Sequence, residues 1–243
     1  FQESLERLNP NVIIVVAFRM LPEKVWRFPK YGTFNLHASL LPQYRGAAPI
    51  HWAIINGETE TGVTTFFIDD KIDTGEIILQ EKATIESDDT VGDLHDRLMH
   101  LGTGTVIKTL ELIKEDKAIP LPQPKSKDFK TAYKLNAENT KINWERPIKD
   151  IYNHVRGLNP FPVAYTMIQN GDEELRAKLY SVKLLQENHS HDLGKLVIKD
   201  NELYIAGHGG YLVIEEMQLP NKKRMAVKDL LNGFTFDAYA YAF

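Results

Sequence analysis

The stretch FNLHASLLPQYRGAAP, residues 34–49, places an asparagine and a histidine two residues apart on a short apolar run. Side chains at positions i and i+2 of a β-strand project to the same face, so Asn35 and His37 would point together. A loop containing proline and glycine follows at once. If the strand is central in an α/β sheet, its carboxyl end opens into the crevice where such sheets bind ligands.

The residues on either side of this strand predict the rest of an α/β unit. A continuous apolar run before it suits a strand buried on both faces of a parallel sheet. Later in the sequence, apolar residues recur at helical spacing over a long segment that begins at Thr90, which predicts a helix. The expected strands are 12–17, 34–37, 62–68 and 76–81, and the expected helices are 48–57 and 90–114.

The predicted secondary structure changes after a segment rich in proline and lysine. The segment AIPLPQPKSKDFKTAYK reads as an extended linker. A helix near 147–156 is then followed by short strands with turn signals between them, which predicts a small antiparallel barrel or sandwich. The expected strands lie near 162–169, 175–184, 194–199, 202–206 and 211–219. We expect domains at 1–120 and 131–243, joined by a linker at 121–130.

Composition restricts the class of protein. The chain has 243 residues and no cysteine, which excludes disulfides and cysteine–zinc sites. No apolar run is long enough to span a bilayer, and nothing in the composition argues for secretion, so we expect a cytoplasmic protein. The net charge is −4, and it is uneven: residues 1–120 carry 12 basic and 18 acidic side chains, whereas residues 121–243 carry 17 and 15. The second half is therefore better suited to a polyanion.

A second polar turn, IDDKIDTGEI, supports a catalytic role for His37, which the sequence around His37 does not establish by itself. A lone histidine on a strand is more often structural than catalytic, and an aspartate in a turn usually bonds its own backbone. Here, however, Asp73 follows a strand that can neighbour the strand of His37. An aspartate facing the histidine would favour its charged form. Together with Asn35, these groups suit addition to a carbonyl carbon, because they can stabilise an oxyanion and move a proton.

The stretch from residue 34 to 77 resembles the signature of folate-dependent formyltransferases. The Asn-x-His pair, the Ser-Leu-Leu-Pro loop and the later Asp-Thr-Gly carry this resemblance. YRGAAPI and two downstream stretches, INWERPIKDIYNHVRGLNPFPVAYT and LVIEEMQLPNKKRMAVKDLLNGF, resemble the methionyl-tRNA formyltransferases within that group. The resemblance implies a partial Rossmann-like α/β catalytic domain followed by a smaller OB-like β-barrel, and covers residues 12–234.

The resemblance also implies the partners and the roles of individual residues. The formyl donor would be 10-formyltetrahydrofolate, the acceptor initiator methionyl-tRNA, no metal would be needed, and we expect a monomer. The implied catalytic residues are Asn35, His37 and Asp73. The implied folate contacts are Phe18, Arg19, Met20, Leu21, Ser39, Leu40, Leu41, Pro42, Ile68, Asp69, Asp70, Lys71 and Ile72. The expected tRNA contacts are Arg45, Gly46, Lys125, Lys127, Lys130, Lys134, Lys222, Lys223, Arg224 and Lys228.

Two alternatives remain open at the level of sequence. The acceptor could instead be the amine of a sugar nucleotide or of a glycinamide ribonucleotide. The chain could also be a catalytically inert fragment that only binds RNA, because it opens with a helix and strand where members of the family begin with further βα units. We therefore expect an upstream segment of the catalytic domain, roughly 70 residues at about 30 residues a unit.

Overall fold

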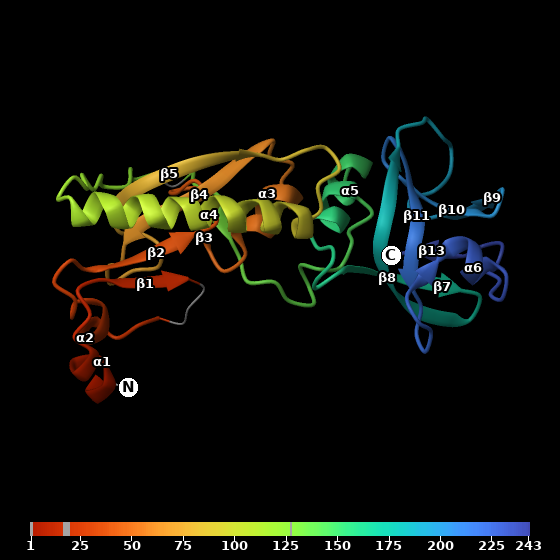
Figure 1. The fold of residues 1–243 in the computed structure, drawn as a ribbon. Coiled ribbons are helices and arrows are strands. Elements are labelled where there is room, and N and C mark those ends of the chain that lie inside the picture. Colours follow the sequence, from red (N-terminus) through yellow and green to blue (C-terminus); the bar gives the residue numbers. More distant parts are fainter. Residues whose placement is uncertain (1, 17–19, 127) are drawn as a thin grey trace. The chain divides into compact units, whose positions relative to one another are not determined.

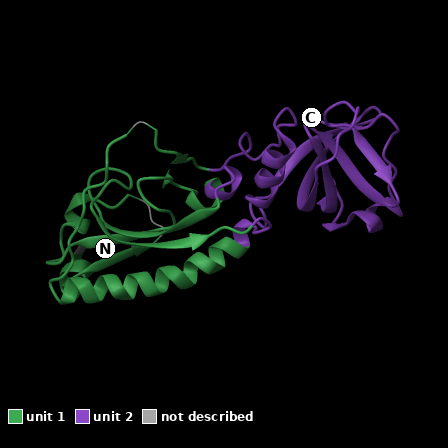
Figure 2. Ribbon diagram, turned by 90° about the horizontal axis from the view of Figure 1, so that it is seen from above, with its two compact units in different colours: residues 1–52, 59–86, 93–134 green, residues 53–58, 87–92, 135–243 purple. Residues whose placement is uncertain are grey.

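The computed structural model describes residues 2–16, 20–126 and 128–243. Contacts divide the chain into two compact units, coloured separately in Figure 2. Both units draw on separate stretches of sequence, because short pieces of the first half pack with the second. Unit 1 comprises residues 1–52, 59–86 and 93–134, and unit 2 comprises residues 53–58, 87–92 and 135–243.

Unit 1 is built on a mixed four-stranded sheet with the strand of the Asn-x-His pair in its interior (Figure 1). The strand order is β1-β2-β4-β5. β1 and β2 are parallel, whereas β4 runs antiparallel to both β2 and β5. The expected α/β class is confirmed, with a sheet that is only partly parallel. The strands are β1 (Ile13–Val16), β2 (Thr33–His37), β4 (Glu60–Phe67) and β5 (Ile77–Thr84).

The expectation that the first strand is buried on both faces is wrong. β1 lies at one edge of the described sheet. Val15 is buried, but Ile14 is 40% exposed and Val16 is 59% exposed. Alternate side chains of a strand point to opposite faces, and the face that carries Val16 lines an open cavity rather than a packed layer. A continuous apolar run does not by itself distinguish these two situations.

One long helix, α4 (Val91–Lys114), covers a face of this sheet (Figure 1). Its apolar stripe forms as predicted, with Leu94 and Leu98 buried. It lies close to the sheet: the Thr109 hydroxyl is 2.7 Å from that of Thr65 on β4, and Gly102 packs against Leu36 of β2. The shorter helices of unit 1 are α1 (Gln2–Leu8), α2 (Glu23–Trp26) and α3 (Pro49–Ile55).

The proline-rich segment is fastened to unit 1 rather than extended away from it. Leu121 exchanges two backbone hydrogen bonds with Ile77, at 2.9 and 2.8 Å. Further on, β6 (Thr131–Ala132) pairs in parallel with β3 (Arg45–Gly46). Residues up to 134 therefore belong to unit 1 by their contacts.

Unit 2 contains the predicted antiparallel barrel. Its sheet has the order β13-β7-β8-β11-β10-β9, with β12 on β11. Leu196 N–H donates to the Ala240 carbonyl at 3.1 Å, which brings β9 to the other end of the sheet and nearly closes it. The elements are α5 (Ile148–Arg156), β7 (Ala164–Asn170), β8 (Glu173–Leu185), β9 (Leu196–Lys199), β10 (Glu202–Gly207), β11 (Gly210–Gln218), β12 (Met225–Ala226), α6 (Val227–Leu231) and β13 (Tyr241–Ala242).

Local sequence explains two turns of the barrel. Asp200 and Asn201 have φ of +52° and +65°, and positive φ at both central residues is what a type I′ turn between β9 and β10 requires. Asn221 has φ of +59°, at the start of the basic cluster after β11. Aspartate and asparagine tolerate this region better than most residues other than glycine. In the described part of the chain, no helix combines the length and apolarity needed to cross a bilayer.

Candidate active site

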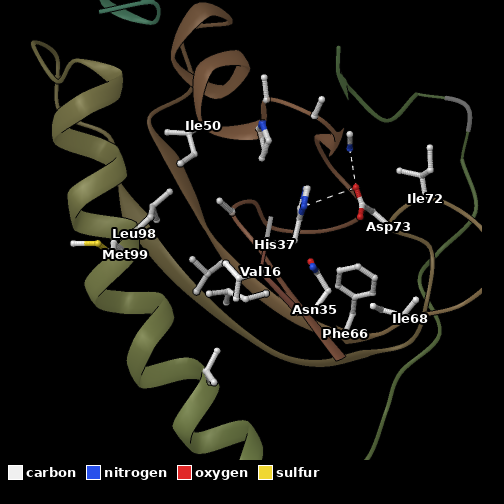
Figure 3. A pocket seen from close by; sticks show the side chains of 18 of the residues that line it. Val16, Asn35, His37, Ile50, Phe66, Ile68, Ile72, Asp73, Leu98 and Met99 are labelled. Carbon is white, nitrogen blue, oxygen red and sulfur yellow. Dashed lines mark hydrogen bonds and ion pairs between the residues drawn. The ribbon is translucent and has the colours of Figure 1, made fainter. Parts of the chain in front are cut away.

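The carboxyl end of β2 brings Asn35 and His37 to one cavity, as their spacing predicts. The cavity lies within unit 1 and has a volume of about 1080 Å³. Both side chains line it, although Asn35 is only 4% and His37 only 7% exposed. Figure 3 shows them in the same part of the cavity, near Phe66 of β4 and Asp73. Buried polar side chains are normally hydrogen-bonded, so the partners of Asn35 and His37 determine how the two side chains are oriented.

The backbone of the following loop fixes the tautomer of His37. His37 Nε2 lies 2.8 Å from the carbonyl oxygen of Tyr44. A carbonyl oxygen only accepts hydrogen bonds, so Nε2 must carry the proton. In the neutral ring, Nδ1 is then the nitrogen with the free lone pair. Tyr44 has φ of +59°, and its N–H donates to the Lys130 carbonyl at 2.7 Å. The backbone of Tyr44 is therefore held in place by a residue of the proline-rich segment.

Asp73 faces the other nitrogen of that ring. Its Oδ2 is 3.8 Å from His37 Nδ1 and accepts the Gly46 N–H at 2.9 Å (Figure 3). The aspartate side chain is only 13% exposed, so little solvent screens it from the ring. The carboxylate and the ring nitrogen are therefore close enough, and buried enough, to act on a substrate atom together.

Asn35 is tied to the neighbouring strand. Its Nδ2 donates to the Val15 carbonyl on β1 at 3.1 Å, which uses one of the two amide hydrogens. An asparagine amide has a second hydrogen and a carbonyl oxygen. The side chain therefore has a fixed position and retains a donor that can serve an oxygen atom in the cavity.

The turn before Asp73 contributes a wall of the cavity. Asp69 shapes this turn, because its carboxylate accepts the Thr74 hydroxyl at 2.8 Å and the Lys71 N–H at 3.0 Å. Asp69 is thus occupied within its own turn. The predicted folate contacts that line the cavity are Met20, Leu21, Ile68, Asp69, Asp70, Lys71 and Ile72, whereas Phe18 and Arg19 lie outside the described residues.

The Ser39–Pro42 loop stands beside this site without lining the cavity. Ser39 is fully buried, and its hydroxyl donates to the Gln43 carbonyl at 2.7 Å. The Thr64 hydroxyl joins both ends of the loop: it donates to the Ser39 carbonyl at 2.6 Å and accepts the Leu41 N–H at 3.1 Å. None of the four residues, Ser39, Leu40, Leu41 and Pro42, is among those that line the cavity.

The expected tRNA contacts fall into two groups in different units. Arg45 and Gly46 lie at the active-site loop, and Gly46 lines the cavity. Lys125, Lys130 and Lys134 are exposed in unit 1, and Lys127 lies outside the described residues. In unit 2, Lys223, Arg224 and Lys228 are exposed and Lys222 is half-buried. Arg224 forms an ion pair with Glu216 and lies over the Tyr180 ring.

Sequence patterns missed the groups that support the three polar side chains. The oxygen that orients His37 belongs to the backbone of Tyr44, and every residue has such a carbonyl, so the residue type at position 44 gives no signal of this contact. Gln123 donates to the carbonyls of Asp73 and Gly75 from a segment that reads as a linker. A glutamine fifty residues from its partner has no periodicity that could have found it.

Two family models match the chain. The model described as "Formyl transferase" matches residues 1–110, and the model described as "Formyl transferase, C-terminal domain" matches residues 134–235. The methionyl-tRNA formyltransferase of Flavobacterium johnsoniae is 56% identical over 97% of this chain and 75% of its own length. That of Flavobacterium psychrophilum is 49% identical over 100% of this chain and 77% of its own length.

Solved structures with the same fold extend the comparison. HypX from Aquifex aeolicus in complex with tetrahydrofolic acid covers 97% of this chain with a TM-score of 0.70 and 21% identity, over 41% of that chain. The N-formyltransferase from Helicobacter canadensis, in complex with folinic acid and dTDP-3-aminofucose, covers 74% of this chain and 64% of its own, with a TM-score of 0.59 and 27% identity. At 21% identity the first similarity concerns the fold alone.

Proposed function

The chain belongs to the methionyl-tRNA formyltransferase family, and from that premise we propose that it transfers the formyl group of 10-formyltetrahydrofolate to the α-amine of initiator methionyl-tRNA. The observation that carries this proposal is the meeting of Asn35, His37 and Asp73 in one cavity of unit 1. A formyl transfer to an amine needs stabilisation of an oxyanion and removal of a proton from nitrogen, and these side chains can supply both.

Each of the three side chains has a distinct task in this proposal. His37 Nδ1 is the proton-accepting atom of the neutral ring, because Nε2–H is committed to the Tyr44 carbonyl. The Asp73 carboxylate, 3.8 Å away, stabilises the positive charge that the ring gains. The remaining amide hydrogen of Asn35 is available to an oxygen atom on which negative charge develops.

The lining of the cavity fits a folate co-substrate. Apolar side chains such as Ile50, Phe66 and Leu98 form much of it, and the turn at 68–72 adds polar residues to the lining. A flat heterocycle with polar edges suits walls of this kind. The folinic acid named for the Helicobacter canadensis structure supports the choice of folate, since that structure is 27% identical to this chain. When bound, the folate would supply the activated formyl group, with the 39–42 loop as a further proposed contact.

The acceptor is argued from the second unit and from the relatives. Relatives at 56% and 49% identity carry the name methionyl-tRNA formyltransferase over nearly the whole of this chain. In unit 2, the exposed basic residues Lys223 and Lys228 can contact phosphates. A second candidate acceptor is the amine of a sugar nucleotide, which is favoured by the dTDP-3-aminofucose in the Helicobacter canadensis structure.

A direct assay tests the proposal and separates the two acceptors. Formyl transfer from 10-formyltetrahydrofolate is measured with charged initiator methionyl-tRNA and, side by side, with an amino-sugar nucleotide. We expect transfer to methionyl-tRNA only. Transfer to the sugar nucleotide alone would overturn the acceptor, and RNA binding without transfer to either would make the chain an RNA-binding protein.

A further inference from the structure

A glutamine of the proline-rich segment joins the two polar loops of the active site. Gln123 Nε2 donates to the Asp73 carbonyl at 3.0 Å and to the Gly75 carbonyl at 2.8 Å. Its Oε1 accepts from Nε and Nη2 of Arg45, at 3.1 and 2.5 Å. Both amide hydrogens and both lone pairs of the carboxamide are therefore used.

The partners fix which way this carboxamide points. Carbonyl oxygens only accept and a guanidinium only donates, so the opposite orientation of Gln123 would lose all four hydrogen bonds. A glutamate could still accept from Arg45 but could not donate to the two carbonyls. A glutamine is thus required for the contact with the Asp73 turn, and this requirement can be tested separately from the contact with Arg45.

The Asp73 turn depends on support of this kind. Asp73 has φ of +54°, a conformation that is uncommon for a residue other than glycine. Its carboxylate is held at one point by the Gly46 N–H at 2.9 Å, and its carbonyl is held by Gln123. Without the two donors of Gln123, the carbonyls of Asp73 and Gly75 would turn towards other donors and the carboxylate would move with them.

We propose that Gln123 is a positioning residue that holds the Asp73 carboxylate opposite His37 Nδ1. The proposal rests on the function proposed above, and it assigns a part of the catalytic apparatus to the proline-rich segment. Gln123 does not line the cavity, so it acts through Asp73 and not on the substrate. Displacement of a catalytic group by about 1 Å can lower a rate by roughly 10²-fold, so the effect falls on kcat.

We expect the segment to stay in place when the glutamine side chain is changed, because its backbone is anchored on both sides of Gln123. Leu121 is paired with Ile77 on one side of Gln123. On the other side, the Lys130 N–H donates to the Gln43 side chain at 2.9 Å and the Lys130 carbonyl accepts the Tyr44 N–H at 2.7 Å. A substitution at 123 therefore removes the carboxamide contacts and leaves the backbone anchors.

The test compares Gln123→Leu, Gln123→Glu and a control in the full chain. The control is Gln169→Leu, the same chemical change at a barrel glutamine whose side chain donates to the nearby Gly171 carbonyl at 2.8 Å, far from the Asp73 turn in the sequence. Two quantities are measured: steady-state kcat and KM for both substrates, and the NMR resonance of the Gly46 amide, which reports the hydrogen bond to the Asp73 carboxylate. We expect both variants at 123 to move that resonance and to lower kcat about 10- to 100-fold with little change in the folate KM.

Three outcomes would overturn the proposal. An unmoved Gly46 resonance in Gln123→Leu means that Asp73 keeps its place without the glutamine. A moved resonance with wild-type kcat means that the displacement has no catalytic consequence. Wild-type behaviour of Gln123→Glu would leave only the Arg45 contact with a role. If the wild-type chain transferred no formyl group, the proposed function would fail, while the Gly46 resonance would still decide whether Gln123 positions Asp73.

Discussion

At the scale of single residues, the site depends on a buried histidine whose two nitrogens have different partners. Tyr44 holds Nε2 through a carbonyl oxygen, and Asp73 faces Nδ1 with a carboxylate. Neither contact can be exchanged for the other, because one partner requires a donor and the other stabilises a charge. This asymmetry supports the proton-transfer role that we propose for His37.

The first prediction removes the charge of Asp73. Asp73→Asn is nearly isosteric, keeps a residue that tolerates φ of +54°, and should lower kcat/KM by roughly 10²–10⁴-fold. His37→Ala should have an effect of the same order. Asp200→Asn is a matched control, since Asp200 has φ of +52° in the β9–β10 turn. Steady-state kinetics with circular dichroism checks this, and near wild-type turnover of Asp73→Asn would contradict the assigned role.

The second prediction concerns a histidine that the proposed reaction does not use. Burial lowers the pKa of His154 from its ordinary 6.5 to about 4, with Arg146 adding to the shift and a hydrogen bond to the Thr140 backbone opposing it. Its Nε2 is buried with no partner in the described part of the chain. Between pH 6.5 and 4 the unfolded state binds more protons than the folded state, so stability must decrease as the pH falls through this window.

The size of this effect follows from the shift. It is at most about 3 kcal/mol between pH 7 and pH 4, at 1.36 kcal/mol for each pKa unit. His154→Leu should flatten the dependence of the unfolding free energy on pH over this range, whatever its effect on stability at pH 7. Urea denaturation of both chains from pH 4 to 8 measures it. Parallel curves would mean that His154 is not the group that titrates.

At the scale of elements, the connection between β4 and β5 sets the position of Asp73. Gly75 is buried, and a Cβ placed on it would lie 1.7 Å from the Phe67 carbonyl oxygen at the end of β4. A backbone atom cannot move aside as a side chain can, so the turn accepts only glycine at this position. The close approach fixes the path of the chain from the strand to the aspartate.

The third prediction substitutes this glycine. Gly75→Ala should force the turn open, separate Asp73 from Gly46 and lower both stability and kcat/KM, the latter by roughly 10²-fold through misplacement of the carboxylate. Gly171→Ala is the control for a barrel turn where no atom lies within 4 Å of the added Cβ, and it should cost only the strain of its φ of +59°. Retention of full activity by Gly75→Ala would show that the turn can adjust.

At the scale of the whole molecule, the two units differ in what they can bind. Unit 1 holds the cavity and the polar triad, whereas the barrel of unit 2 carries exposed basic residues. Arg224 is already paired with Glu216, so its contribution to a phosphate contact should be smaller than that of the neighbouring lysines. Binding of the small co-substrate and binding of the polyanion should therefore be separable by mutation.

The fourth prediction tests this separation. Replacing Lys222, Lys223 and Arg224 with alanine should raise KM for the tRNA and flatten the dependence of log Kd on log salt concentration by roughly 2, because fewer counterions are released. KM for the folate should not change. A triple control replaces the exposed Lys82, Lys114 and Lys117 of unit 1. Titrations of tRNA binding against salt measure the slopes, and equal slopes for wild type and the first variant would place the tRNA surface elsewhere.

The sequence by itself determined the local elements and the pairing of Asn35 with His37. Apolar residues at helical spacing predicted α4, and short strands at regular spacing predicted the barrel, because these patterns report which face of an element is buried. The i, i+2 rule placed Asn35 and His37 on one face of β2 for the same reason.

Only the tertiary structure decided the contacts that orient the polar side chains of the candidate active site. The Tyr44 carbonyl, the Gly46 amide and the Gln123 carboxamide reach the site from separate loops, through hydrogen bonds that leave no periodic trace in the sequence. The exposure of Val16 could not be predicted from the sequence either. A strand that faces a packed layer and a strand that faces a cavity can have the same apolar sequence. Local patterns encode burial along one element, whereas the position of Asp73 depends on residues up to fifty positions away that meet only when the chain has folded.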